Sequence, residues 1–187
     1  LSEPLVFHAQ GGDVRVAAWG TRRLGSQTER EHQLGRQVTV LDYVSPDDFA
    51  IQFNTTSDGD QLVLAKVAPK ETLAATLASV LERAAKKEDD GDSLYSRYFH
   101  PGESLAVPVI SLGISRRYDE IEGRRLRNAE FQGVSFDAAR QRIRFRMDET
   151  GARLASDAYM AAKSKMSATP PREFIFDRPF LLYLRRT

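Results

Sequence analysis

The fold is decided by residues 170–184, which read PPREFIFDRPFLLYL. The two leading prolines lack a backbone N–H donor and hold the chain in an extended path. Two dense apolar runs follow, at 174–176 and 180–184, and an Asp-Arg-Pro joint separates them. Short apolar runs bounded by turn residues are typical of buried strands. We therefore expect a buried strand, a tight joint and a second buried strand.

Upstream of this stretch, arginines alternate with apolar residues over positions 142–147. A period of two predicts a strand with one apolar face and one arginine face. One interpretation is a half-buried strand whose long basic side chains extend into water. The other is a basic patch that binds a polyanion. The first is favoured, because no aromatic residue accompanies the arginines on their own face.

The segment between these two stretches begins with a polar turn. Residues 148–151 read Asp-Glu-Thr-Gly, and a glycine that closes a polar stretch indicates a turn. The even-numbered positions from 152 to 162 then carry Ala, Leu, Ser, Ala, Met and Ala, none of them charged. A strand made from this segment would have one face that can be buried and one wet face. It can pair beside residues 142–149 as a hairpin or stay out as a loop.

The order of these features resembles the C-terminal part of the serpins, the serine protease inhibitor family. In serpins an acidic pair and a glycine begin the hinge of the reactive-centre loop, a run of small residues follows, and an aromatic strand closes the segment. The residues that match the hinge are Glu149, Gly151, Ala152, Ala155 and Ala158. The residues that match the closing strand are Phe176, Asp177, Pro179 and Phe180. The match is specific over residues 138–184.

The resemblance implies an α+β fold of mainly antiparallel sheets, with one long amphipathic helix at about 70–87 and one short helix. It implies a single serpin-like domain over residues 1–187, or a fragment or half of a larger fold. The chain departs from the family by lacking the long helical first half and by ending at Thr187, before the last strand. It also places Arg153, Leu154 and Asp157 in the hinge, where efficient inhibitors favour small or uncharged residues.

The resemblance also implies a protein partner, of which a serine protease is one candidate. An active inhibitor would use residues 152–169 as its reactive-centre loop. The candidate scissile residues are then Lys163, Lys165 and Ser167, and the lysines point to a trypsin-like target. Alternatively, the lysines only keep a mobile loop soluble. Because a half-fold lacks a gap that could receive the loop, we expect a non-inhibitory serpin-like protein-interaction domain, with an active inhibitor as the alternative.

The first half of the chain has the patterns of an antiparallel meander followed by one helix. Two short apolar runs around Gly11-Gly12 indicate a hairpin, and residues 38–44, 49–53 and 62–67 indicate three further strands. Pro69 suits a first helical turn. The apolar residues that recur at helical spacing after it are Leu73, Leu77, Val80, Leu81 and Ala84.

Beyond this helix, residues 105–110 indicate a strand, with Pro108 at an edge or a bulge. Residues 118–128 are highly charged and indicate a short helix or a turn.

Composition narrows the possible functions further. The 187 residues include no cysteine, so disulfides, thiol catalysis and cysteine-ligated zinc are excluded. The net charge of +1 gives no support for nucleic-acid or membrane-surface binding. His8, His32 and His100 are isolated and lack metal-ligand spacing. We expect no enzyme activity, cofactor or metal. Leu1 in place of Met and the absence of a signal pattern indicate a processed product, a designed chain or a fragment.

Overall fold

The computed structural model describes residues 4–21, 37–54, 59–89, 94–100, 102–148 and 170–186. The chain divides into two compact units. The first, called the main unit, comprises Leu1–Val109 and Asp148–Thr187, and the second, called the ribbon, comprises Ile110–Met147. No described helix is long and apolar enough to cross a membrane.

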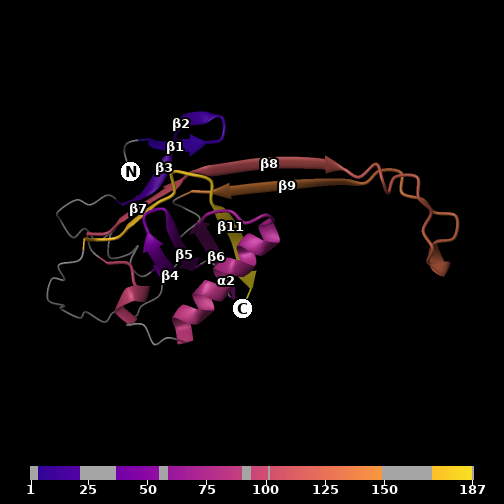
Figure 1. Ribbon diagram of the computed structural model, residues 1–187. Helices are drawn as coiled ribbons and strands as arrows, with labels where there is room; N and C mark the ends of the chain where they lie inside the picture. Colours follow the sequence, from indigo (N-terminus) through magenta and orange to yellow (C-terminus); the bar gives the residue numbers. More distant parts are fainter. Residues whose placement is uncertain are drawn as a thin grey trace. The chain divides into compact units, whose positions relative to one another are not determined.

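The largest sheet of the main unit has four antiparallel strands in the order β11-β6-β5-β4 (Figure 1). They are β4 (Val38–Ser45), β5 (Asp48–Asn54), β6 (Asp60–Lys66) and β11 (Leu181–Arg186). The three strands predicted between residues 38 and 67 are confirmed, and they form the predicted meander. The second apolar run of residues 170–184, a segment called the closing stretch from here on, forms the fourth strand. The prediction that this strand is buried is wrong, because β11 lies at the edge of the sheet and Leu184 is 63% exposed.

One helix, α2 (Leu73–Asp89), covers a face of this sheet (Figure 1). The helix was predicted over 70–87, but it begins three residues later. The side-chain oxygen of Thr72 accepts a hydrogen bond from the Ala75 backbone N–H at 3.1 Å and so caps the first turn. The prediction that Pro69 occupies the first turn is therefore wrong.

The buried side of α2 also differs from the predicted apolar face. Thr76, Val80 and Ala84 are buried, one turn apart. Leu73 and Leu81 remain 73% and 41% exposed. The helix lies with its smaller residues against the sheet, because small side chains allow a close approach to the strands.

A second sheet of the main unit has three strands in the order β10-β7-β3. They are β3 (Ala18–Thr21), β7 (Ser104–Pro108) and β10 (Glu173–Ile175), and β10 runs parallel to β7. The first apolar run of the closing stretch is therefore a strand, as predicted. Phe174 and Phe176 are fully buried and pack against Phe49 of β5. Their ring centroids lie 5.3 and 5.0 Å from the centroid of the Phe49 ring, respectively. Aromatic rings thus join the two sheets.

The predicted N-terminal hairpin is confirmed as β1 (Leu5–Ala9) and β2 (Gly12–Val16). The expectation of one meander through the whole first third is wrong at β3. This strand leaves the hairpin and pairs antiparallel with β7, far along the chain. The strand predicted over 105–110 is also divided, because β7 ends at Pro108 and the next strand, β8, belongs to another sheet. Pro108 does not mark an edge strand, because β7 is the central strand of its sheet and the proline is its last residue.

The ribbon consists of β8 (Ile110–Arg117) and β9 (Arg140–Met147), which pair antiparallel along their full length. The strand predicted from the alternating arginines is thus confirmed as β9. The residues between them form turns and one short 3₁₀ helix, η2 (Ala129–Phe131). Of the two alternatives for residues 118–128, the turn is the one observed.

Candidate functional site

The residues predicted to form a reactive-centre loop lie outside the described part of the chain, which ends at Asp148 and resumes at Pro170. This applies to the hinge residues Glu149, Gly151, Ala152, Ala155 and Ala158, and to the candidate scissile residues Lys163, Lys165 and Ser167. It applies equally to the alternative of a hairpin or a loop over residues 152–162. Their assignments stay predictions.

Arg172 holds the residues that follow this segment to the rest of the main unit. Its Nε donates a hydrogen bond to Glu103 Oε1 at 2.5 Å, and Glu103 is only 6% exposed. The other guanidinium nitrogens donate to the backbone oxygens of Ser96 and Tyr98 at 2.6 and 2.7 Å. The guanidinium also lies over the Phe174 ring, 5.3 Å from its centroid. A charged pair with this many hydrogen bonds fixes the start of β10.

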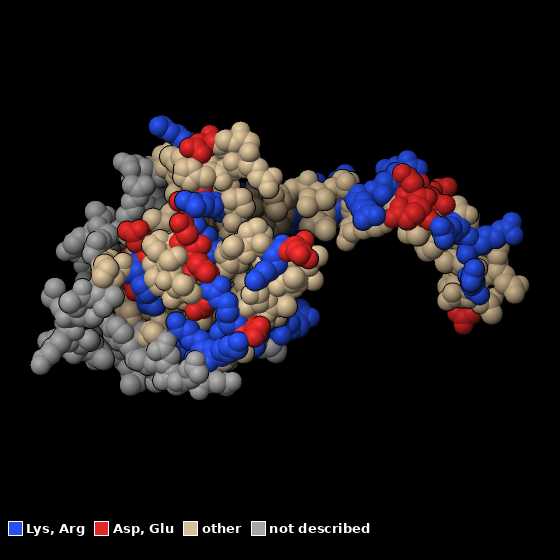
Figure 2. Space-filling view, viewed as in Figure 1, with Lys and Arg blue, Asp and Glu red and all other residues tan. Residues whose placement is uncertain are grey.

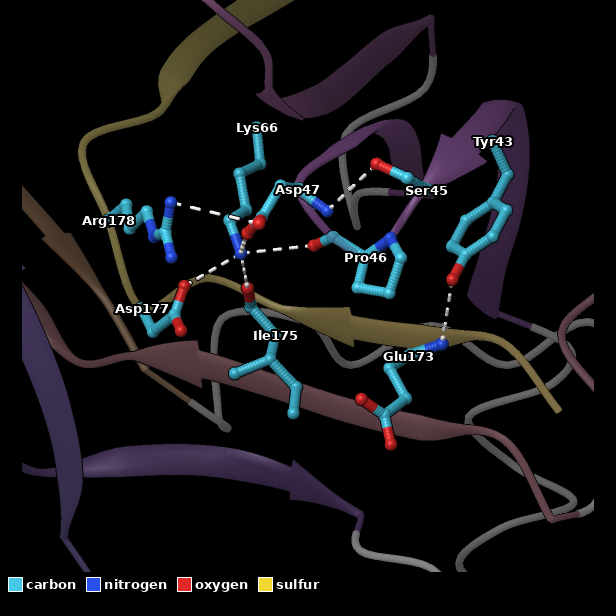
Figure 3. Close-up of polar contacts among 9 residues, drawn as sticks. All are labelled: Tyr43, Ser45, Pro46, Asp47, Lys66, Glu173, Ile175, Asp177 and Arg178. Atoms are coloured by element: carbon cyan, nitrogen blue, oxygen red, sulfur yellow. Dashed lines mark hydrogen bonds and ion pairs between the residues drawn. The ribbon is translucent and has the colours of Figure 1, made fainter. Parts of the chain in front are cut away.

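A buried lysine holds the closing stretch at a second point (Figure 3). Lys66, at the end of β6, is 4% exposed. Its Nζ donates to the backbone oxygens of Pro46 and Ile175 at 3.0 and 3.1 Å. It also forms ion pairs with Asp47 at 2.8 Å and with Asp177 at 2.7 Å. Lys66 therefore joins β6, the β4–β5 turn and the Asp-Arg-Pro joint.

The hydrogen bond from Lys66, with its charge, holds the pKa of the Asp47 carboxyl below the usual value of 3.8. The Asp47 side chain is 57% exposed, whereas that of Asp177 is 24% exposed. Both carboxylates contact the same ammonium group, so Lys66 acts as a structural link between three segments. Lys66 was predicted only as a strand residue. A lysine at the end of a continuous apolar run was the available signal that it is buried.

Metal-ligating side chains do not cluster within the described part of the chain. No group of three or more histidine, aspartate or glutamate side chains among them could hold a metal ion. The His8 ring nitrogen contacts Asp13 at 2.7 Å within the exposed β1–β2 hairpin. His32 lies outside the described residues.

The ribbon has two faces of contrasting chemistry. Because side chains alternate along a strand, the register of β8 and β9 gathers the apolar residues on one face. This apolar face consists of Ile110, Leu112, Ile114, Ile143, Phe145 and Met147. Met147 is buried, but Leu112, Ile114 and Ile143 are 51%, 54% and 47% exposed. The half-buried strand predicted from residues 142–147 thus has an apolar face that is largely open to solvent.

All five acidic residues of the ribbon lie in the turn, whereas its arginines are divided between the turn and the strands. Figure 2 shows acidic and basic side chains gathered around the turn, whereas the strand part in view is mostly uncharged. The strand β8 was not predicted, although Ile110, Leu112 and Ile114 alternate with small residues. This alternation was the signal that could have identified the partner strand of β9.

Known proteins match this chain in structure and not in sequence. No family model matches the sequence, and no curated protein sequence matches it. The structure is similar to thyroxine-binding globulin in complex with thyroxine, with a TM-score of 0.51 and 13% identity over 99% of this chain and 49% of that one. It is also similar to human glycosylated kallistatin, with a TM-score of 0.52 and 12% identity over 100% of this chain and 48% of that one.

Both of these proteins are serpins, and this chain spans about half the length of each. The chain therefore has a partial serpin-like fold, as the resemblance predicted. The fold class is also confirmed, with mainly antiparallel sheets and a single long helix.

Proposed function

We propose that this serpin-like chain is a protein-interaction domain that binds its partner through the apolar face of the ribbon and does not inhibit proteases. The observation that carries this proposal is the exposure of Leu112, Ile114 and Ile143 on one face of a two-stranded sheet. Contiguous exposed apolar residues mark interaction surfaces in soluble proteins. A two-stranded hairpin is also marginally stable alone in water. Covering this face would therefore stabilise both the ribbon and the complex.

The charges of the ribbon indicate the chemistry of the partner. The two strands contain six arginines and no acidic residue, and Arg116 lies on the same side of the ribbon as the apolar face. Charged residues at the rim of an interface favour partners of opposite potential. The partner we propose is a separate protein that presents an apolar sheet or helix face bordered by Asp and Glu.

Site-specific photo-crosslinking tests this proposal on the full chain. A benzophenone amino acid replaces Leu112, whose side chain lies on the apolar face. The matched control places it at Ser111, the neighbouring residue on the opposite face of the same strand. In an extract of the source organism, we expect a discrete protein adduct from position 112 and none from position 111. Mass spectrometry identifies the crosslinked peptide.

A second substitution tests whether the adduct depends on the apolar face. Ile143→Asn places a polar group on the same apolar face and should abolish the adduct from position 112. A crosslinked peptide with apolar residues flanked by carboxylates supports the proposal. The proposal fails if neither position gives an adduct, if both give the same adduct, or if the captured protein is a second copy of this cationic ribbon.

An active inhibitor is the second candidate function, and the anchor at Arg172 is the observation that favours it. A reactive-centre loop needs a fixed downstream end, and Arg172 provides one through Glu103 and two backbone oxygens. Mixing the chain with trypsin separates the two functions. A non-inhibitory domain is cleaved near Lys165 and leaves the protease fully active. A covalent adduct that survives denaturant would instead establish inhibition.

A further inference from the structure

The ribbon face opposite the apolar face carries only basic, small or hydroxyl side chains. The register places Arg140, Arg142, Arg144 and Arg146 of β9 on this face, together with Arg117 of β8. The β8 residues opposite the last three of these β9 arginines are Ser115, Gly113 and Ser111. Neither strand carries a carboxylate on this face. All five acidic residues of the ribbon belong to the turn, where Asp119 and Glu122 contact Arg117 at the end of the face. We call it the arginine face.

Two guanidinium groups at the centre of the arginine face are available for a ligand. Arg117 is paired with Asp119 and Glu122 of the turn. Arg142 and Arg144 are exposed, and within the described part of the chain neither forms an ion pair. Their cross-strand neighbours are Ser115 and Gly113, which carry no charge. This central pair therefore combines positive charge with open space beside it.

The geometry of the arginine face selects among anionic ligands. Residues two apart on a strand are separated by about 7 Å, so the four arginines of β9 form a row about 20 Å long. Each guanidinium can hold a phosphate through two parallel hydrogen bonds. The face has no apolar residue to form the core of a protein interface and no aromatic residue to stack on bases. The small residues of β8 leave a shallow lane beside the row.

We propose that the arginine face is a binding site for a linear chain of phosphate groups without bulky substituents. Such a ligand lies along β9 with successive phosphates near Arg142 and Arg144, and the serine hydroxyls of β8 can donate further hydrogen bonds. This site is on the face of the ribbon opposite the apolar face, through which we propose that the chain binds its protein partner. It can therefore be tested whether or not the proposed function holds.

Fluorescence anisotropy with end-labelled inorganic polyphosphate tests the site on the full chain. The variant carries Arg142→Gln and Arg144→Gln, which remove two charges from exposed strand positions. We expect its affinity to fall at least about tenfold, because hydrogen bonds between charged groups are strong. The slope of log affinity against log salt should become shallower by about 1 to 2, since up to two counterion-releasing contacts are lost.

A matched control removes the same charge from the turn, through Arg124→Gln and Arg127→Gln. We expect this control to stay within about twofold of the unmodified chain, because charges beyond a screening length contribute little. Thermal unfolding of both variants checks that the fold is retained. Equal losses in the two variants, or no loss in the Arg142 and Arg144 variant, would overturn the site.

Two competitors check the class of ligand. Duplex DNA and dextran sulfate, added at equal concentrations of charged groups, should displace polyphosphate less effectively than unlabelled polyphosphate does. Either competitor proving stronger would overturn the assignment to an unsubstituted phosphate chain. A further variant, Arg142→Lys with Arg144→Lys, keeps the charge but loses the planar fork of donors. We expect it to bind less tightly than the unmodified chain and more tightly than the glutamine variant.

Discussion

Replacing Lys66 by methionine is expected to lower the free energy of unfolding by about 3 kcal/mol or more. Methionine keeps the apolar stem of the side chain but removes the ammonium group that contacts Asp177 and Asp47. Asp177 is then left partly buried without its cation, and the backbone oxygens of Pro46 and Ile175 lose their donor. Equilibrium unfolding in urea, followed by circular dichroism, measures the change.

Lys70→Met is the matched control, because Lys70 is exposed beyond the end of β6 and should tolerate the change within about 0.5 kcal/mol. The pH dependence gives a second readout. Asp47 has a pKa held below 3.8 by Lys66, so this contribution is present above pH 3.8 and is lost as pH falls through the lower folded-state value. The acid limb of stability should be shallower in the Lys66→Met variant. Equal stability of the two variants would show that the ion pairs do not hold the closing stretch.

Replacing Gly20 by alanine is expected to cost about 2 to 6 kcal/mol of stability, from backbone strain and overpacking together. Gly20 has a φ of +133°, which a residue with a Cβ rarely adopts. A Cβ built there would lie 2.1 Å from the backbone oxygen of Leu105 and 2.8 Å from its carbonyl carbon. Both contacts are with backbone atoms of β7, so β3 must move away from its partner strand.

Gly113→Ala provides the comparison, since a Cβ at Gly113 meets nothing within 4 Å. We expect this change to alter the unfolding free energy by less than about 1 kcal/mol. Thermal and urea unfolding of both variants, with hydrogen exchange of the β3 amides, measure the difference. Equal unfolding free energies of Gly20→Ala and Gly113→Ala would contradict the close approach of the β3 and β7 backbones at Gly20.

Local patterns predicted the elements whose pairing partners are near in sequence. The strands β4, β5 and β6 were recognised because β-branched and aromatic runs alternate with turn residues. The long helix was also recognised from its period, but its start was not. The helix begins at Leu73 because the side chain of Thr72 caps its first turn. Pro69 lies before this cap and does not set the start.

Features that depend on distant residues were not predictable in the same way. The departure of β3 from the hairpin follows from pairing with β7, and no local signal near Trp19 specifies that partner. The burial of Lys66 depends on Asp177, which lies in the closing stretch. The apolar face of the ribbon was missed because it needs β8 and β9 together, and only β9 was recognised as a strand. The reactive-centre loop was predicted by resemblance alone, and it lies outside the described residues.

The apolar face of the ribbon is expected to be uncovered in the isolated chain. Methyl NMR with a soluble paramagnetic agent measures this directly, residue by residue. We expect strong relaxation enhancement at the methyl groups of Leu112, Ile114 and Ile143, and little at Ile51 and Leu64, which are fully buried in the main unit. Equal protection of both sets would contradict it, because the ribbon face would then already be covered.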